Sequence, residues 1–300
     1  MIKRIRGDRL IRSEFTRHEE ILRREINRLE HRIESYTSAP ERAHSSSSDA
    51  SVHVRVSPLD SPQVSDVLKS VWNENDNEAY RRDMSHWRGS AERWQPERWE
   101  KIGVANLRLL NEYREFLNSR HPGAPEMAKV LEWGPGGGSN LYSLKPVCDE
   151  LYGVDISTEN LKESTRVLAE LKGATFSAVH LDGHPSSIKA QIGALVETII
   201  STAVFQHFPS KQYGREVVKT MFELACPLAV GLIQIRFDNG NPKYTSKSVA
   251  EYEQSHLTAT SYAVDEFWDL LQEQGFIPTD VSNLNSEINY ATFRFYKPAA

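Results

Sequence analysis

Cysteine is scarce in this chain of 300 residues, which contains only Cys148 and Cys226. Two cysteines so far apart lack the spacing of a zinc site and allow at most one disulfide. We therefore expect free thiols in a reducing compartment. The basic start Met1–Arg6 is not followed by an apolar segment, so we expect no secretory signal. No apolar run reaches the ~18 residues of a membrane-spanning helix, and we expect a cytoplasmic protein.

A concentrated basic surface is also lacking. The formal net charge is −5, and acidic residues outnumber basic ones across residues 127–300. Binding to a nucleic-acid backbone needs clustered Lys and Arg, so we expect no nucleic-acid partner. Acidic residues interleave with the N-terminal arginines, which argues against a membrane-surface helix. The absence of a Gly-Lys-Ser/Thr motif excludes a P-loop.

Four regions follow one another along the chain. Residues 1–38 have a heptad pattern, residues 39–56 include four consecutive serines and predict a flexible linker, and residues 57–126 hold four of the six tryptophans. We expect the tryptophan-rich region to be a helical cap, since a disordered segment would not carry so many large aromatics. Residues 127–300 form the main domain.

The heptad pattern is strongest in its second half. Leu22, Ile26, Leu29, Ile33 and Tyr36 occupy the two core positions of successive heptads. This pattern predicts self-association through a coiled coil and hence a homo-oligomer. The alternative is a single amphipathic helix that docks on its own domain.

Strands and helices alternate from Lys129 onward. The predicted strands are 129–132, 151–155, 176–181, 198–201, 229–237, 279–283 and 290–296, and the predicted helices are 139–146, 158–172, 185–193, 210–225 and 263–274. This alternation predicts an α/β fold with a Rossmann-like, doubly wound seven-stranded sheet. The last two strands have no helix between them and predict a C-terminal antiparallel pair.

A glycine-rich turn follows the first predicted strand. Gly134, Gly136 and Gly138 come directly after Glu132, and Ser139 or Asn140 suits the N-cap of the next helix. Asp155 ends the second strand, at the distance from the turn where a ribose-binding acid stands in dinucleotide sites. Glu132 would repel a pyrophosphate but attract an ammonium group, which argues against a dinucleotide. Asp182 ends the third strand, where it can accept a hydrogen bond from an adenine amino group.

With these residues in place, the stretch from about 127 to 297 resembles the class I S-adenosylmethionine-dependent methyltransferases. The glycine motif is Glu132 to Gly138, and the segment after the fourth strand, Ser201 to Pro209, is similar to a further motif of that family. The resemblance implies S-adenosylmethionine as cofactor. It also implies that the cofactor is bound by Glu132, Gly134, Gly136, Gly138, Asp155, Ile156, Asp182, Gly183, Ser201 and Thr202. The structural alternative is that Asp155 and Asp182 only cap the helices after them.

His207 is the candidate catalytic residue. It follows the fourth strand at the ligand-binding edge of the sheet, and histidine suits removal of a proton from a hydroxyl at neutral pH. Candidate acceptor-binding residues are Gln206, Arg236, Asp238 and Trp87. Each has a structural alternative, such as the turn predicted by Asp238-Asn239-Gly240.

These observations predict a methyltransferase that acts on a hydroxyl of a small molecule, either a sugar or a secondary metabolite. We assign no metal site. The alternatives within methyl transfer are an N-methyltransferase and a metal-dependent O-methyltransferase that uses Asp238. Alternatives of another class are an NAD-type oxidoreductase and an oligomeric scaffold with a vestigial cofactor site.

Overall fold

The chain divides into two compact units, Met1–Arg55 and Val56–Ala300. The computed structural model describes residue 68 and residues 70–72, 77–247, 256–285 and 287–299, all within the second unit. The predicted heptad helix at 1–38 and the predicted linker at 39–56 lie outside the described residues.

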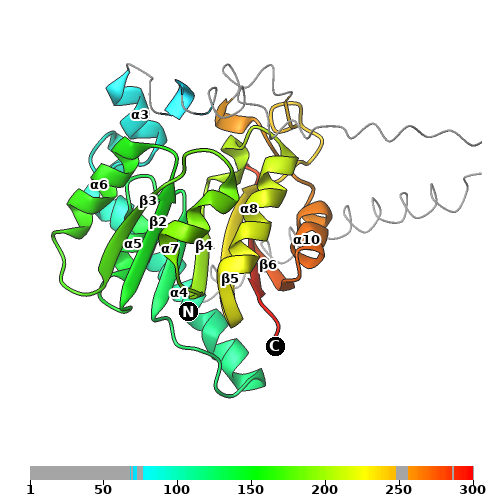
Figure 1. The fold of residues 1–300 in the computed structure, drawn as a ribbon. Coiled ribbons are helices and arrows are strands. Elements are labelled where there is room, and N and C mark those ends of the chain that lie inside the picture. Colours follow the sequence, from blue (N-terminus) through cyan, green and yellow to red (C-terminus); the bar gives the residue numbers. More distant parts are fainter. Residues whose placement is uncertain (1–67, 69, 73–76, 248–255, 286, 300) are drawn as a thin grey trace, which may run out of the picture. The chain divides into compact units, whose positions relative to one another are not determined.

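One seven-stranded sheet forms the centre of this unit (Figure 1). Its strands are β1 (Lys129–Trp133), β2 (Glu150–Asp155), β3 (Thr175–His180), β4 (Val196–Ser201), β5 (Ala225–Arg236), β6 (Ile277–Asn285) and β7 (Tyr290–Tyr296). They lie in the order β3-β2-β1-β4-β5-β7-β6. Strands β1 to β5 are parallel, whereas β7 runs antiparallel to both β5 and β6. The predicted α/β sheet with its C-terminal antiparallel pair is confirmed.

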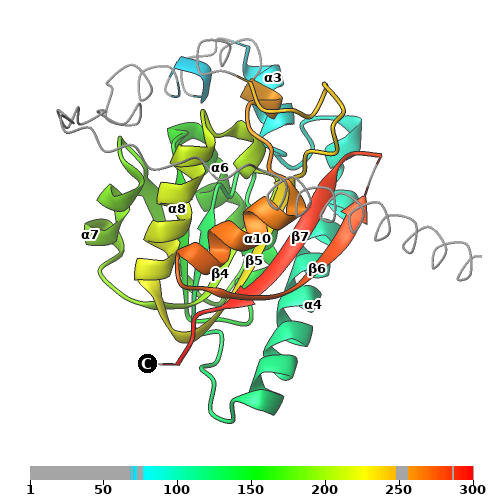
Figure 2. The same ribbon diagram turned by 90° about the vertical axis from the view of Figure 1, so that its right-hand side faces the viewer.

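Helices cover both faces of the sheet (Figure 2). On one face α4 (Pro96–Arg120), α5 (Ser139–Leu144) and α6 (Thr158–Leu168) share a core with Val130. On the other face α8 (Lys211–Leu224) and α10 (Val264–Glu273), with the short α7 (Lys189–Ile192), share a core with Leu131. Consecutive residues of a strand point to opposite faces, which explains why Val130 and Leu131 enter different cores. None of the described helices has both the length and the apolar character to cross a membrane.

Helix α4 packs closely against α5. A Cβ on Gly103 would lie 2.2 Å from the carbonyl oxygen of Ser139, so only glycine permits this approach. The Gly103 N–H donates to Ser139 Oγ at 3.1 Å, and that hydroxyl donates to the Trp99 carbonyl at 2.6 Å. The second half of the tryptophan-rich region thus covers one face of the sheet, and its first half, with α3 (Glu78–Met84), leads to the ligand-binding edge.

The predicted N-cap of α5 is wrong. The N-cap residue is Gly138, in the left-handed region at φ 85°, and no side chain caps the helix. Ser139 instead bonds to α4, and Asn140 turns its amide toward Glu132 at 2.6 Å. Contacts with distant parts of the chain therefore determine the roles of both side chains, which a local capping rule does not include. The helix predicted at 263–274 is present as α10, and Gly275 follows its C-cap Gln274 in the left-handed region at φ 97°.

Candidate active site

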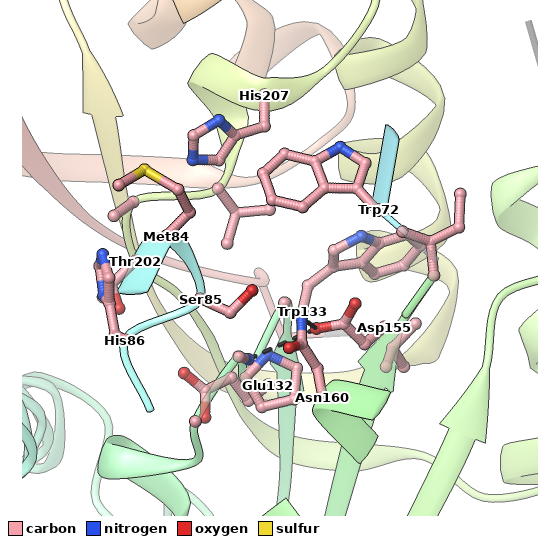
Figure 3. A pocket seen from close by; sticks show the side chains of 18 of the residues that line it. Trp72, Met84, Ser85, His86, Glu132, Trp133, Asp155, Asn160, Thr202 and His207 are labelled. Atoms are coloured by element: carbon pink, nitrogen blue, oxygen red, sulfur yellow. Dashed lines mark hydrogen bonds between the residues drawn. The ribbon is translucent and has the colours of Figure 1, made fainter. Parts of the chain in front are cut away.

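A pocket lies at the carboxyl ends of β1, β2 and β4, the edge where open α/β sheets bind ligands (Figure 3). Its empty space measures about 950 Å³ with the open mouth included. The largest part of its lining comes from the end of β1 with the glycine turn, the end of β2 and the stretch after β4. Residues 68, 72, 84–86 and 181 and single residues or pairs of α4, α5, α6 and α8 complete it. Two carboxylates, Glu132 and Asp155, are the only acidic groups among its described lining residues.

Glu132 is buried at the end of β1, with 1% of its surface exposed. Its Oε1 accepts a hydrogen bond from the Asn140 amide at 2.6 Å, and that amide also donates to Thr202 Oγ1 at 3.0 Å. Asn106 donates to Asn140 Oδ1 and thereby fixes the orientation of the amide. Among the described residues, Glu132 Oε2 has no hydrogen-bond partner. Burial raises the pKa of Glu132 to about 8. A buried acceptor of this kind is suited to a cationic ligand group.

Asp155 is buried at the end of the neighbouring strand β2. Its Oδ1 accepts from the Ser157 N–H at 2.8 Å, while Oδ2 accepts from the Gly136 N–H at 3.4 Å and from the Asn160 amide at 3.3 Å. Burial raises its pKa to about 6 despite these donors. The two contacts to Oδ2 are long, so this oxygen retains capacity to accept hydroxyl hydrogens.

The glycine turn supports a second layer of chain, Ser85–Arg88, which we call the roof segment. The Gly137 N–H donates to the Ser85 carbonyl at 2.7 Å. A Cβ on Gly136 would lie 2.6 Å from that carbonyl, and a Cβ on Gly137 would lie 2.3 Å from the His86 carbonyl. The glycines at 136 and 137 are therefore required for the close approach of the roof segment.

Side-chain contacts hold the roof segment in place. Trp87 Nε1 donates to Asn160 Oδ1 at 2.9 Å, and Trp99 Nε1 donates to the His86 carbonyl at 2.8 Å. Arg88 forms an ion pair with Glu170. Asn160 thus joins the roof segment to Asp155, because its amide nitrogen and oxygen bind one each.

His207 lines the pocket from the stretch after β4. Its Nδ1 lies 2.9 Å from the His256 carbonyl, which places a proton on Nδ1 and leaves Nε2 as an acceptor. Gln206 Nε2 lies 3.3 Å from His207 Nε2, farther than from the Ala203 carbonyl at 2.9 Å. Burial lowers the pKa of His207 to about 4, so its imidazole is neutral at pH 7.

A second histidine, His86, lines the same pocket from the roof segment. Its backbone is left-handed at φ 57°, and its ring stacks on Trp94 with centroids 4.0 Å apart. Neither ring nitrogen forms a hydrogen bond with a described residue. Burial lowers its pKa to about 4, and a charge on His207 would lower it further. Both imidazoles that line the pocket are therefore neutral at pH 7, and protonation of one would disfavour protonation of the other.

The comparisons with known proteins find likeness in fold. No protein-family model matches the chain, and no curated protein matches it in sequence. Magnesium protoporphyrin IX methyltransferase (ChlM) from Synechocystis PCC 6803, solved with bound SAH, is 15% identical, with a TM-score of 0.51 over 77% of this chain and 99% of that one. The same protein with bound SAM is 18% identical, with a TM-score of 0.49 over 78% and 96%. N-methyltransferase NodS from Bradyrhizobium japonicum WM9 is 12% identical, with a TM-score of 0.45 over 63% and 87%.

The alignment with the first of these covers 99% of that protein and 77% of this chain. The chain has the class I S-adenosylmethionine-dependent methyltransferase fold. In this methyltransferase fold the pocket, the glycine turn and the two carboxylates stand together at one edge of the sheet. The unpartnered Glu132 Oε2 suits the ammonium group of the cofactor, and Asp155 suits its ribose hydroxyls.

Most of the cofactor residues predicted from the methyltransferase motifs lie at the pocket. Glu132, Gly134, Gly136, Asp155, Ile156 and Thr202 line it. Gly138 and Ser201 do not line it: Gly138 packs against Ser164 in α6, and Ser201 Oγ donates to the Trp133 carbonyl at 2.9 Å. Asp182 is exposed and, like Gly183, lies outside the lining, although the preceding Leu181 is part of it.

Of the predicted acceptor residues, none lines the pocket. Trp87 faces Asn160, and the Gln206 amide lies against His207 Nε2 and donates to the Tyr290 hydroxyl. Arg236 donates to the Tyr290 hydroxyl at 3.0 Å. Asp238 Oδ1 accepts from the Gly240 N–H at 2.8 Å, the turn that was its structural alternative. Among the described residues, no group of three His, Cys, Asp or Glu side chains could hold a metal ion.

Sequence reasoning missed several residues that shape the site. Asn140 and Asn160 position the two carboxylates, while Trp72 and Met84 line the pocket from before α4. Asn140 is the second residue of α5, the helix that follows the glycine turn, and Asn160 lies five residues after Asp155. Their short polar side chains next to the motif acids were the available signal. Trp72 and Met84 have no such signal, because only the chain trace brings them to this edge.

Proposed function

We propose that the protein is an S-adenosylmethionine-dependent methyltransferase that acts on a hydroxyl of a small molecule. The proposal rests chiefly on one observation: two buried carboxylates end adjacent parallel strands beside a glycine turn, and Glu132 Oε2 faces no partner among the described residues. An NAD-type cofactor fits less well, because its pyrophosphate would meet the Glu132 carboxylate rather than N–H donors.

The cofactor supplies an activated methyl group on a sulfonium. What the protein adds is alignment of the acceptor and exclusion of water. Glu132 and Asp155 would bind the ammonium group and the ribose of the cofactor, while Trp72, Met84 and His207 border the opposite side of the pocket (Figure 3). This arrangement supports an acceptor subsite on the side of His207.

A hydroxyl acceptor must lose its proton as its oxygen attacks the methyl carbon. His207 is the proposed general base, since its Nδ1–H is held by the His256 carbonyl and its neutral Nε2 can take the proton. The Gln206 amide lies 3.3 Å from the same Nε2 and donates to the Tyr290 hydroxyl, so it can hold the orientation of the imidazole.

The cofactor assignment is tested with Asp155→Ala. We expect the dissociation constant for S-adenosylhomocysteine to rise at least tenfold, because the ribose loses its carboxylate acceptor, and calorimetry measures this directly. Asp238→Ala is the matched control, since that carboxylate serves a turn away from the pocket. Equal affinities of the wild type and Asp155→Ala would remove Asp155 from the site.

The base assignment is tested with His207→Ala. We expect S-adenosylhomocysteine affinity to remain within about twofold, and methyl transfer to a hydroxyl acceptor to slow by about 10²–10⁴-fold. Mass spectrometry of acceptor mixtures identifies the methylated product and follows its rate. Full turnover of the variant would show that His207 is not the base.

A further inference from the structure

We infer that the acceptor is an uncharged, planar aromatic molecule that carries the methylated hydroxyl. The inference rests on the proposed methyltransferase function and names the class of its substrate. It follows from the shape-forming, charged and hydrogen-bonding side chains that line the pocket apart from the proposed cofactor residues.

The acceptor side of the pocket is mainly apolar and aromatic. The apolar and aromatic residues of the lining include Leu68, Trp72, Met84, Val204, Phe208 and Tyr213, and the two histidines line the same pocket. The Trp72 ring meets the His207 ring edge-on with centroids 5.0 Å apart. Figure 3 shows Trp72, Met84 and His207 together on one side, away from Glu132 and Asp155. Aromatic and thioether side chains of this kind pack well on a flat ring.

Charge on the lining excludes several acceptors. No Lys or Arg is among the described residues that line the pocket, so an anionic acceptor would be buried without a counter-charge. The lining carboxylates are Glu132 and Asp155, which the cofactor engages. A cationic amine would therefore also lack a partner.

Hydrogen-bonding capacity argues against a sugar. Among the polar side chains of the lining, Asn140, Asn160 and Thr202 belong to the hydrogen-bond networks of Glu132 and Asp155, and Ser139 bonds to α4. Apart from the carboxylates and the indole N–H groups, this leaves Ser85, His86, His207 and Tyr213. A sugar carries a hydroxyl on nearly every carbon, and each one buried without a partner costs free energy. An aromatic ring with one hydroxyl places that group against the imidazoles and the ring against the apolar wall.

Acidity points the same way. The hydroxyl of a phenol has a pKa of about 10, as in tyrosine, whereas an aliphatic hydroxyl is closer to water at about 15.7. Burial leaves both imidazoles weakly basic, so they match the more acidic hydroxyl better. In the balanced step, the hydroxyl proton passes to the His207 imidazole and an oxygen electron pair forms the O–CH₃ bond. The C–S bond breaks with its electrons on sulfur, which becomes a neutral thioether.

His86 is the positioning residue in this account. Its ring nitrogens bond to no described residue, its backbone is held left-handed, and its ring is braced by Trp94. In the proposed complex the His86 imidazole forms a hydrogen bond with the acceptor, in the same pocket that His207 lines. The residue thereby distinguishes a hydroxyl from a hydrogen at the same ring position.

The test is a binding series on the full chain saturated with S-adenosylhomocysteine. The probes are β-naphthol, naphthalene, β-naphthoate, β-naphthylamine and methyl glucoside, measured by calorimetry. We expect β-naphthol to bind about tenfold tighter than naphthalene and tighter than the other three. With S-adenosylmethionine, we expect mass spectrometry to find its methyl ether. Tighter binding of the glucoside, the carboxylate or the amine, or no binding of β-naphthol, would overturn the inference.

Two variants locate the subsite. His86→Asn keeps a residue that tolerates left-handed backbone but withdraws the imidazole. It should remove most of the tenfold preference for β-naphthol over naphthalene while S-adenosylhomocysteine affinity stays unchanged. His184→Asn, at an exposed histidine, is the matched control.

An unchanged preference in His86→Asn would overturn the positioning role, and the wild-type series remains decisive if that variant does not fold. Failure of S-adenosylhomocysteine to bind the wild type would instead refute the proposed function itself.

Discussion

At the scale of single residues, the pocket contains two acids whose ionised forms are disfavoured by burial. Glu132 and Asp155 are both buried, and burial raises the pKa of each above its ordinary value. A protein retains such groups at a cost to stability, and clusters of shifted acids are typical of functional sites. The sequence placed Glu132 and Asp155 at the ends of the first two strands, because apolar runs end at both acids, and the structure shows that these strands are neighbours. The sequence could not place Asp182, whose exposure depends on how the loop after β3 turns.

The raised pKa of Glu132 predicts proton release when the cofactor binds. Below pH 8 the free carboxyl is largely protonated, and an ammonium group beside it lowers its pKa. Binding of S-adenosylhomocysteine near pH 7 should therefore release up to one proton, and affinity should fall as pH falls below about 8. Calorimetry in buffers of different ionisation enthalpy measures the proton count. Glu132→Gln should abolish this contribution, and an identical count in the variant would contradict the assignment.

At the scale of elements, the glycine turn borders both the pocket and the roof segment. From sequence, its glycines indicated space for a ligand, and the structure shows that the roof segment occupies part of that space. The carbonyl oxygens of Ser85 and His86 stand where side chains at Gly136 and Gly137 would be. Periodicity and turn rules describe neighbours along the chain, so they predicted β1, α6 and β7 well but not this contact across about fifty residues.

Gly137→Ala tests the contact between the turn and the roof segment. A methyl group there would lie 2.3 Å from the His86 carbonyl oxygen and 2.8 Å from Trp87 Cα, so the roof segment must shift. We expect a lower melting temperature and faster proteolysis near Ser85–Arg88. Gly193→Ala, where nothing lies within 4 Å of the added carbon, is the control and should show only the cost of its left-handed backbone. Equal behaviour of the two variants would mean that the roof segment is not held this way.

At the scale of the whole molecule, the methyltransferase fold of the sheet is combined with helix α4 and the segment before it. Helix α4 covers a sheet face, and the segment before it supplies Trp72, Met84 and His86 to the pocket. This explains why cofactor class could be predicted from the sequence while the acceptor wall could not. The acids and glycines follow strand ends, whereas the wall is built by chain that reaches the edge from far away.

Self-association through the heptad pattern stays a prediction. In the full chain, Leu22→Glu combined with Leu29→Glu would place charges in the predicted coiled-coil core, and we expect the oligomer to dissociate. Sedimentation velocity of the wild type and the double variant measures the change. Ser46→Glu combined with Ser48→Glu, in the predicted linker, is the matched control. A monomeric wild type would rule out the coiled coil as an oligomerisation element.

The most direct test of the central claim is a calorimetric titration of the purified protein with S-adenosylmethionine, alongside one with NAD⁺. The account predicts a saturable site for S-adenosylmethionine, with one equivalent bound per chain, and no measurable site for NAD⁺. Because we propose that Glu132 and Asp155 bind the cofactor, the double variant Glu132→Gln with Asp155→Ala should lose this binding. Saturable binding of NAD⁺ with none for S-adenosylmethionine would contradict the account.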